Sequence, residues 1–275
     1  MRATRPFIFL VVLFCAGGLA ATAYGCDIFI HGNLADTSYF DDLPMHVKWD
    51  STMEIEDAAE YVAESILEQA KGCEDSPVVL RPHGYAASVV HYILGLGRRY
   101  ANMFPGHDYV RVFKKTSMVV SYMGAYNGTP LMDFLCAGDK REEITSVLGE
   151  KCVMSMTTSR IHHSVQTVAS PGVPIHLVYS RNSLDYSEYT GEQLSRHCVD
   201  WADYEVGVKN NNDSVVPEYS QRACYKAQVI NDGYDKCDKI DDEFFQDFEM
   251  TKRYSHTGFF GDDAFLFKVV DDEKK

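Results

Sequence analysis

A short buried strand leads into a tight turn and then into a helix that begins with small residues. Residues 76–80 form the apolar strand, Pro82, His83 and Gly84 form the turn, and residues 85–99 have apolar side chains at helical spacing. A turn this tight needs a residue that tolerates positive φ, and glycine does so at little cost. The unit favours a parallel sheet with functional groups at the carboxyl ends of its strands.

Strand and helix patterns alternate along the rest of the chain. This alternation predicts one α/β domain, with a mainly parallel sheet and helices on both faces. With 275 residues and 45% apolar content, the chain can bury one sizeable core. Residues 136–168 and 182–203 are expected to be insertions at one edge of the sheet. The other expected strands are residues 26–30, 46–49, 117–122, 173–179, 204–208 and 248–254, and another helix is expected over 53–71.

The N-terminus has the pattern of a cleaved signal peptide. Two arginines precede an apolar stretch over residues 7–15, and small residues suited to cleavage follow at 21–23. We therefore expect a signal peptide over 1–23 and one domain over 24–275, in a secreted or periplasmic protein. No other segment is long and apolar enough to predict a transmembrane span.

The net charge argues against a nucleic-acid partner. The whole chain has 26 basic and 40 acidic residues, a formal charge of −14. Removal of residues 1–23 takes away two arginines and no acids, which leaves 24 basic residues and a charge of −16. A surface this acidic repels phosphate backbones and anionic headgroups.

The cysteines predict disulfides rather than a zinc cluster. None form a CxxC pair, and an exported protein is oxidised, so we expect at least two disulfides of undetermined pairing. One alternative is a lipidated N-terminal cysteine at Cys26, although the preceding residues fit a lipobox badly. Seven cysteines remain after signal removal: Cys26, Cys73, Cys136, Cys152, Cys198, Cys224 and Cys237.

The turn after residues 76–80 resembles the nucleophile elbow of lipases. Residues 82–87 stand where those proteins carry the pattern G-H-S-x-G-G, and Gly84 takes the place of the serine. Small residues fit the close packing of such an elbow. Glycine has no hydroxyl, however, so the attacking group of a serine hydrolase is missing.

Two later turns resemble the remaining parts of a catalytic triad. Asp213 lies in a turn similar to the N-D-G-x-V-P turn of lipases, and His256 lies in a segment similar to their histidine loop. Two alternatives stay open for the acid. Asp213 could instead cap the helix that follows it, and Asp185 is a rival for the acidic role.

Taken together and in chain order, these pieces resemble the α/β-hydrolase superfamily, in particular small secreted lipases and esterases. The resemblance implies a minimal sheet that lacks the first two strands of the full fold. It also implies an oxyanion hole from the amides of Tyr85 and of Asn33 or Leu34, after the His31-Gly32 turn. It implies no cofactor and no metal.

Two functions are compatible with this pattern. The first is a pseudoenzyme that binds an ester, a lipid or a protein partner in a hydrolase pocket. The second is an active ester hydrolase that uses Asp213 and His256 with another nucleophile, either Ser88 or a water molecule. Loss of the serine from such a triad lowers turnover about a million-fold, which favours the first.

Two other features have simpler explanations. His162 and His163 are adjacent and lack a third metal ligand at suitable spacing, so they are expected to lie in a polar loop. The acidic stretch over residues 231–243 is expected to be a solvated loop, because its glycine is wrongly placed for an EF-hand.

Overall fold

The computed structural model describes the chain from its first strand to the histidine at position 256, with gaps. The described residues are 26–32, 38–41, 43, 45–74, 76–129, 132–133, 136, 152–168, 170–180, 213, 215–230, 233–239, 243–250 and 256.

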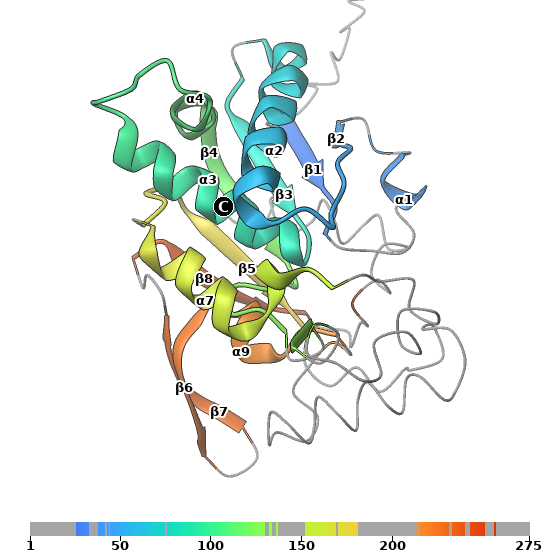
Figure 1. Cartoon of the computed structure of the whole chain (residues 1–275), viewed down its shortest axis with the longest axis vertical. Helices are drawn as coiled ribbons and strands as arrows, with labels where there is room; N and C mark the ends of the chain where they lie inside the picture. Colours follow the sequence, from blue (N-terminus) through green and yellow to red (C-terminus); the bar gives the residue numbers. More distant parts are fainter. Residues whose placement is uncertain are drawn as a thin grey trace, which may run out of the picture.

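Six strands form one sheet in the order β2-β1-β3-β4-β5-β8 (Figure 1). Each neighbouring pair is parallel. The predicted parallel sheet is therefore confirmed, and six described strands agree with the predicted minimal version. The strands are β1 (Cys26–Ile30), β2 (His46–Val47), β3 (Val78–Pro82), β4 (Thr116–Tyr122), β5 (Ile175–Tyr179) and β8 (Phe245–Glu249).

Strand β3 is central because it pairs with β1 on one side and β4 on the other. All five of its residues are buried, as expected for a parallel strand covered on both faces. Its side chains alternate, so Val78 and Leu80 join the larger core cluster while Val79 joins the cluster on the opposite face.

Helices α2 (Ile55–Gln69), α3 (Tyr85–Tyr100), α4 (Asp108–Lys115) and α7 (Thr158–Thr167) pack together on one face of the sheet (Figure 1). Helix α3 contacts each of the other three. The inner face of α2 is entirely apolar, which leaves its outer face for charged residues. Its buried residues are Ile55, Ala58, Ala59, Val62, Ala63, Ile66 and Leu67.

The opposite face carries the short helix α1 (Ser38–Asp41), whose Phe40 packs with Phe29 and Val79. Helices are therefore found on both faces among the described residues. A buried ion pair also lies on this side. The Arg81 guanidinium donates to the Asp27 carboxylate at 2.6 Å and to the Tyr122 hydroxyl at 2.6 Å.

Residues 136–168 were expected to be an insertion at the edge of the sheet, and this is wrong for residues 152–168, which the structure describes. A 3-10 helix, η2 (Met154–Met156), and helix α7 lie there, and α7 belongs to the helical layer. Positions 162 and 163 are part of α7, so the polar loop expected there is also wrong. Ile161 and Val165, one helical turn apart, are fully buried in the main core. Residues 182–203 and the expected strand 204–208 lie outside the described residues.

Two other boundaries differ from expectation. The last strand begins at Phe245 rather than at residue 248, because the Phe245 side chain packs into the main core. The acidic stretch 231–243 is not simply a loop. It contains β7 (Gly233–Lys239), which pairs antiparallel with β6 (Cys224–Ile230) in a separate hairpin (Figure 1).

Disulfides Cys26–Cys73 and Cys136–Cys152 meet the expectation of at least two, and Cys224 is also disulfide-bonded. The first joins β1 to the 3-10 helix η1 (Ala70–Cys73) that ends α2. Because the Cys26 sulfur is paired, it has no thiol to carry a lipid, and that alternative is wrong. Within the described ranges, no helix has the length and apolarity needed to cross a bilayer.

Candidate functional site

The candidate site lies where β1 and β3 end at the carboxyl edge of the sheet. His31 and Gly32 follow β1 directly, and His83 and Gly84 follow β3. The two turns touch. A Cβ added to Gly32 would lie 2.6 Å from the His83 carbonyl oxygen and 2.9 Å from the Tyr85 nitrogen. Glycine at position 32 therefore allows the β1 turn to reach the elbow.

Gly84 has the backbone conformation of a strained elbow, with φ +54° and ψ −121°. It is the N-cap of α3, so the chain passes from strand to helix through this one residue. Its N–H donates to the Tyr122 carbonyl at 3.0 Å, and its own carbonyl accepts from Ala125 at 3.0 Å. The positive φ explains why glycine is favoured here.

The first helical position of α3 is Tyr85, and the N-terminal N–H groups of a helix lack intrahelical partners. The 16-residue helix also directs the positive end of its dipole at the elbow. An oxygen with negative charge is stabilised at such a place. Tyr85, one of the predicted oxyanion donors, therefore lies at the N-terminus of α3, whereas Asn33 and Leu34, the other predicted donors, lie outside the described residues.

Asp213 and His256 form a buried pair. The His256 Nδ1 lies 2.7 Å from an Asp213 carboxylate oxygen, and the His256 backbone N–H donates to the Asp213 carbonyl at 2.9 Å. The second carboxylate oxygen accepts from the amides of Val215 and Val216, at 2.9 Å and 2.6 Å. Asp213 is fully buried, and these contacts fix the orientation of its carboxylate.

The contacts of Asp213 distinguish a partner of His256 from a helix cap. The helix after Asp213, α9 (Glu218–Gln221), has Pro217 as its N-cap, and the Asp213 side chain binds the preceding turn and His256 instead. The reading of Asp213 as a mere helix cap is therefore wrong. The rival acid, Asp185, lies outside the described residues.

The imidazole of His256 faces Gly84 directly. A Cβ added to Gly84 would lie 2.9 Å from the His256 Nε2 and 3.3 Å from its Cε1. Gly84, Asp213 and His256 therefore converge at one place, as the sequence predicted. Any side chain at position 84 would therefore begin in contact with the His256 Nε2.

His83 is a residue of this site whose role the sequence did not indicate. Its Nε2 lies 2.8 Å from the His256 backbone carbonyl oxygen, and the two ring centroids are 4.3 Å apart. The bond requires that His83 Nε2 carries the proton. Burial lowers the pKa of His83 well below its ordinary value, and the neighbouring His256 lowers it further. A neutral His83 thus supports the backbone of His256.

Ser88 does not take part in this arrangement. Its side chain is fully buried in α3, and its hydroxyl donates to the Ala125 carbonyl at 2.8 Å. That hydrogen bond explains a serine in the helix-to-sheet packing without any chemistry. A serine nucleophile at position 88 therefore has no support in the structure.

A cluster of aromatic and histidine rings supports the turn after β1. The His31 ring lies 5.2 Å from His46, 5.8 Å from Phe40 and 5.9 Å from Trp49, and Trp49 Nε1 donates to the His31 carbonyl at 2.8 Å. Burial lowers the pKa of His46 to about 4, with smaller effects from His31 and Lys48. Burial also lowers the pKa of His31, so the imidazoles of His31 and His46 are neutral near pH 7.

Comparison with known proteins gives similarity in structure only. Neither a protein-family model nor a curated protein matches the sequence. The chain is similar to the crystal structure of Bacillus licheniformis lipase BlEst2 in mature form, with a TM-score of 0.58, 14% identity, and coverage of 90% of this chain and 92% of that one. It is also similar to a metagenomic carboxyl esterase, with a TM-score of 0.51, 16% identity, and coverage of 73% and 60%. The chain therefore has an α/β-hydrolase fold.

Proposed function

We propose that this protein is a non-catalytic member of the α/β-hydrolase fold that binds an ester or lipid ligand at the carboxyl edge of its sheet. The observation that carries the proposal is the place of Gly84. The elbow conformation is kept, and His256 Nε2 lies 2.9 Å from the position of a Cβ, but no hydroxyl stands between them.

The large contribution of a serine nucleophile to turnover favours binding over catalysis in a protein that has glycine at this position. Removing the serine of a complete triad lowers turnover about a million-fold, and the residual rate comes from the oxyanion hole and substrate binding. Our proposal is that this site keeps those two contributions. Tyr85 offers its amide at the start of α3, and the buried Asp213–His256 pair fixes the direction of Nε2.

An acyl carbonyl is the group that this arrangement suits. Its carbonyl oxygen can accept from the Tyr85 amide beside the positive end of α3, and the alkoxy oxygen of an ester can accept from His256 Nε2 when that nitrogen is protonated. The lipase and esterase folds of the structural neighbours agree with such a ligand class. The signal-peptide pattern and the disulfides support a location outside the cytoplasm.

The test combines a covalent probe, turnover and binding. We expect no labelling by a fluorophosphonate serine probe and almost no hydrolysis of short-chain nitrophenyl esters. A non-hydrolysable ether analogue of a fatty ester should nevertheless bind the native protein. Gly84→Trp should abolish this binding, because its side chain would collide with His256. Rapid turnover by the native protein would contradict the proposal.

The retained Asp213–His256 pair is the specific observation that favours a second function. With Asp213 fixing its orientation at 2.7 Å, His256 could act as general base toward a water molecule. Weak ester hydrolysis that disappears in His256→Ala, with ligand affinity unchanged, would favour this alternative. Hydrolysis that persists in His256→Ala would contradict both the non-catalytic function and a mechanism that uses His256 as the base.

Mass spectrometry of protein exported from its native host tests the proposed location. We expect a mature N-terminus near Tyr24. Retention of Met1 would contradict the proposed export.

A further inference from the structure

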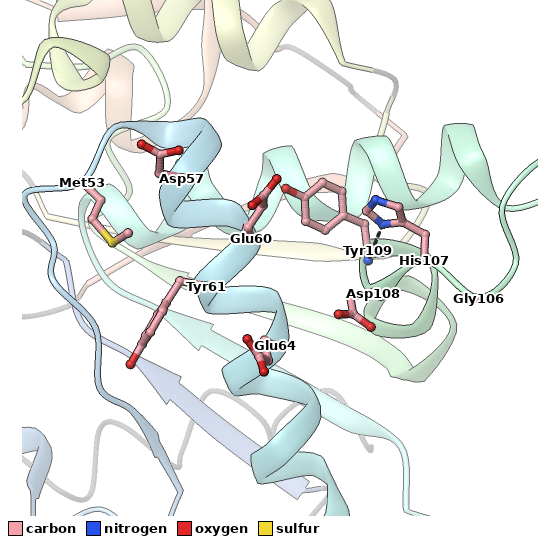
Figure 2. Close-up of a pocket in the computed structure, with 9 residues that line it drawn as sticks. All are labelled: Met53, Asp57, Glu60, Tyr61, Glu64, Gly106, His107, Asp108 and Tyr109. Atoms are coloured by element: carbon pink, nitrogen blue, oxygen red, sulfur yellow. Dashed lines mark hydrogen bonds between the residues drawn. The ribbon is translucent and has the colours of Figure 1, made fainter.

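A cavity of about 670 Å³ lies between the outer face of α2 and the beginning of α4 (Figure 2). Residues from both helices line it, and none of Gly84, Asp213 and His256 does. Its size is in the range of small-molecule sites, about 300–1,000 Å³. The cavity is therefore a second candidate for ligand binding, independent of the proposed function.

The α2 wall carries three carboxylates on one helical face. Asp57, Glu60 and Glu64 are spaced i, i+3 and i+7, and all three are exposed. The structure gives none of them an ion pair with another described residue, in contrast to Asp108 of α4, whose carboxylate accepts from Arg111 at 2.8 Å. Like charges at this spacing repel one another in a helix. A cationic ligand in the cavity would relieve that repulsion.

Tyr109 supplies an observation that does not depend on the carboxylates. Its side chain is 6% exposed and lines the cavity, yet its hydroxyl makes no hydrogen bond to any described residue. Figure 2 shows the ring extending from α4 toward α2, on the side of Glu60. Burial raises the pKa of Tyr109, with a further increase from Glu60, so the phenol stays protonated. The Tyr109 hydroxyl is open to the cavity rather than sealed in the core, so a ligand there can supply its hydrogen-bond partner.

The spacing of the acids argues for an extended cation rather than a metal ion. Within the described part of the chain, no group of three His, Cys, Asp or Glu side chains is close enough to hold a metal ion. Asp57 and Glu64 are separated by about 10 Å along the helix axis, from a rise of about 1.5 Å per residue. Tyr61 and Met53, between and beside these acids, offer surface to an aliphatic chain.

We propose that this cavity binds a linear aliphatic polyamine, a chain of methylene groups that carries two or more ammonium groups. The ammonium groups would pair with the α2 carboxylates and donate to the Tyr109 oxygen, while the methylenes lie along Tyr61 and Met53. A single metal ion or a monoamine can satisfy only part of this arrangement.

Isothermal titration of the full mature chain with spermidine tests the proposal. We expect saturable binding with one site. Glu60→Gln should weaken it about fivefold and Tyr109→Phe about threefold, by the loss of one ionic contact and one hydrogen bond. The matched control is Glu68→Gln, which removes another exposed carboxylate of α2, one that pairs with Lys71 outside the cavity. It should change affinity less than about twofold.

Two further measurements separate a specific site from general attraction to an acidic protein. Butylamine should bind at least about tenfold more weakly than spermidine, because it carries one charge. Magnesium chloride should compete no better than sodium chloride of equal ionic strength. Equal losses in Glu60→Gln and Glu68→Gln, effective competition by magnesium, or no saturable binding at millimolar spermidine would each overturn the proposal. Unchanged thermal stability in Tyr109→Phe would confirm that its effect is on binding.

Discussion

Introducing a hydroxyl at the elbow is the most direct test of the site, and the structure sets the size of the expected effect. In Gly84→Ser the new Cβ would lie 2.9 Å from His256 Nε2. A serine that donates to an imidazole needs about 3.6 Å between these atoms, from a C–O bond of about 1.4 Å and an O···N distance of about 2.8 Å. The imidazole must therefore retreat by about 0.7 Å.

That retreat determines how much activity returns. A complete triad contributes about a million-fold, and a misplacement near 1 Å costs about a hundred-fold. We therefore expect Gly84→Ser to raise kcat for nitrophenyl butyrate by about 10⁴-fold and to react with a fluorophosphonate probe. Serine at φ +54° also costs about 1–2 kcal/mol, which lowers Tm by about 2–8 °C.

Two controls isolate the hydroxyl. Gly84→Ala introduces the same Cβ and the same backbone strain without an oxygen, so it should lose stability equally and gain no activity. Gly84→Ser combined with His256→Ala should keep the serine and lose the gain, because the general base is gone. If Gly84→Ser is as stable as Gly84→Ala yet shows neither labelling nor turnover, the reasoning from the elbow geometry is refuted.

Three other predictions concern stability. The pKa of His46 is about 6.5 in the unfolded chain and about 4 in the folded protein, so the free energy of unfolding should fall as the pH drops through this window. Urea titrations at pH 7 and pH 5 measure this decrease, which should be smaller in His46→Phe. Asp27→Asn leaves the buried Arg81 without its carboxylate and should cost about 3 kcal/mol in the same assay, whereas an unchanged midpoint would show that the pair contributes nothing. Cys73→Ser opens a loop with a sequence separation of 47 and should cost about 4 kcal/mol; a loss below 1 kcal/mol would contradict the loop-entropy estimate.

Local sequence was sufficient for the elbow but not for everything around it. A buried strand, a glycine and a helix of small residues follow one another within a few positions, so residues 82–87 could be placed from their order alone. Asp213 and His256 depended on resemblance to hydrolase motifs, because one aspartate and one loop histidine have no distinctive local pattern.

The remaining parts depend on contacts between distant segments. His83 meets the carbonyl of His256 across 173 positions, and no pattern within either segment indicates that contact. Helix α7 was missed because only two apolar residues, Ile161 and Val165, attach it to the core. Tyr109 lies in a helix of eight residues, and only the packing of α4 against α2 gives its hydroxyl a cavity to face.

The disulfide between Cys26 and Cys73 changes what a cut in the backbone can do. It makes a covalent ring of the segment that contains β1, β2 and α2, and β2 is an edge strand of only two residues. A protease that opens one bond inside this ring separates no fragment, since both halves stay joined through sulfur. The strand next to the elbow is thereby retained after such a cut, and the damaged molecule runs as one band on a gel until a reductant divides it.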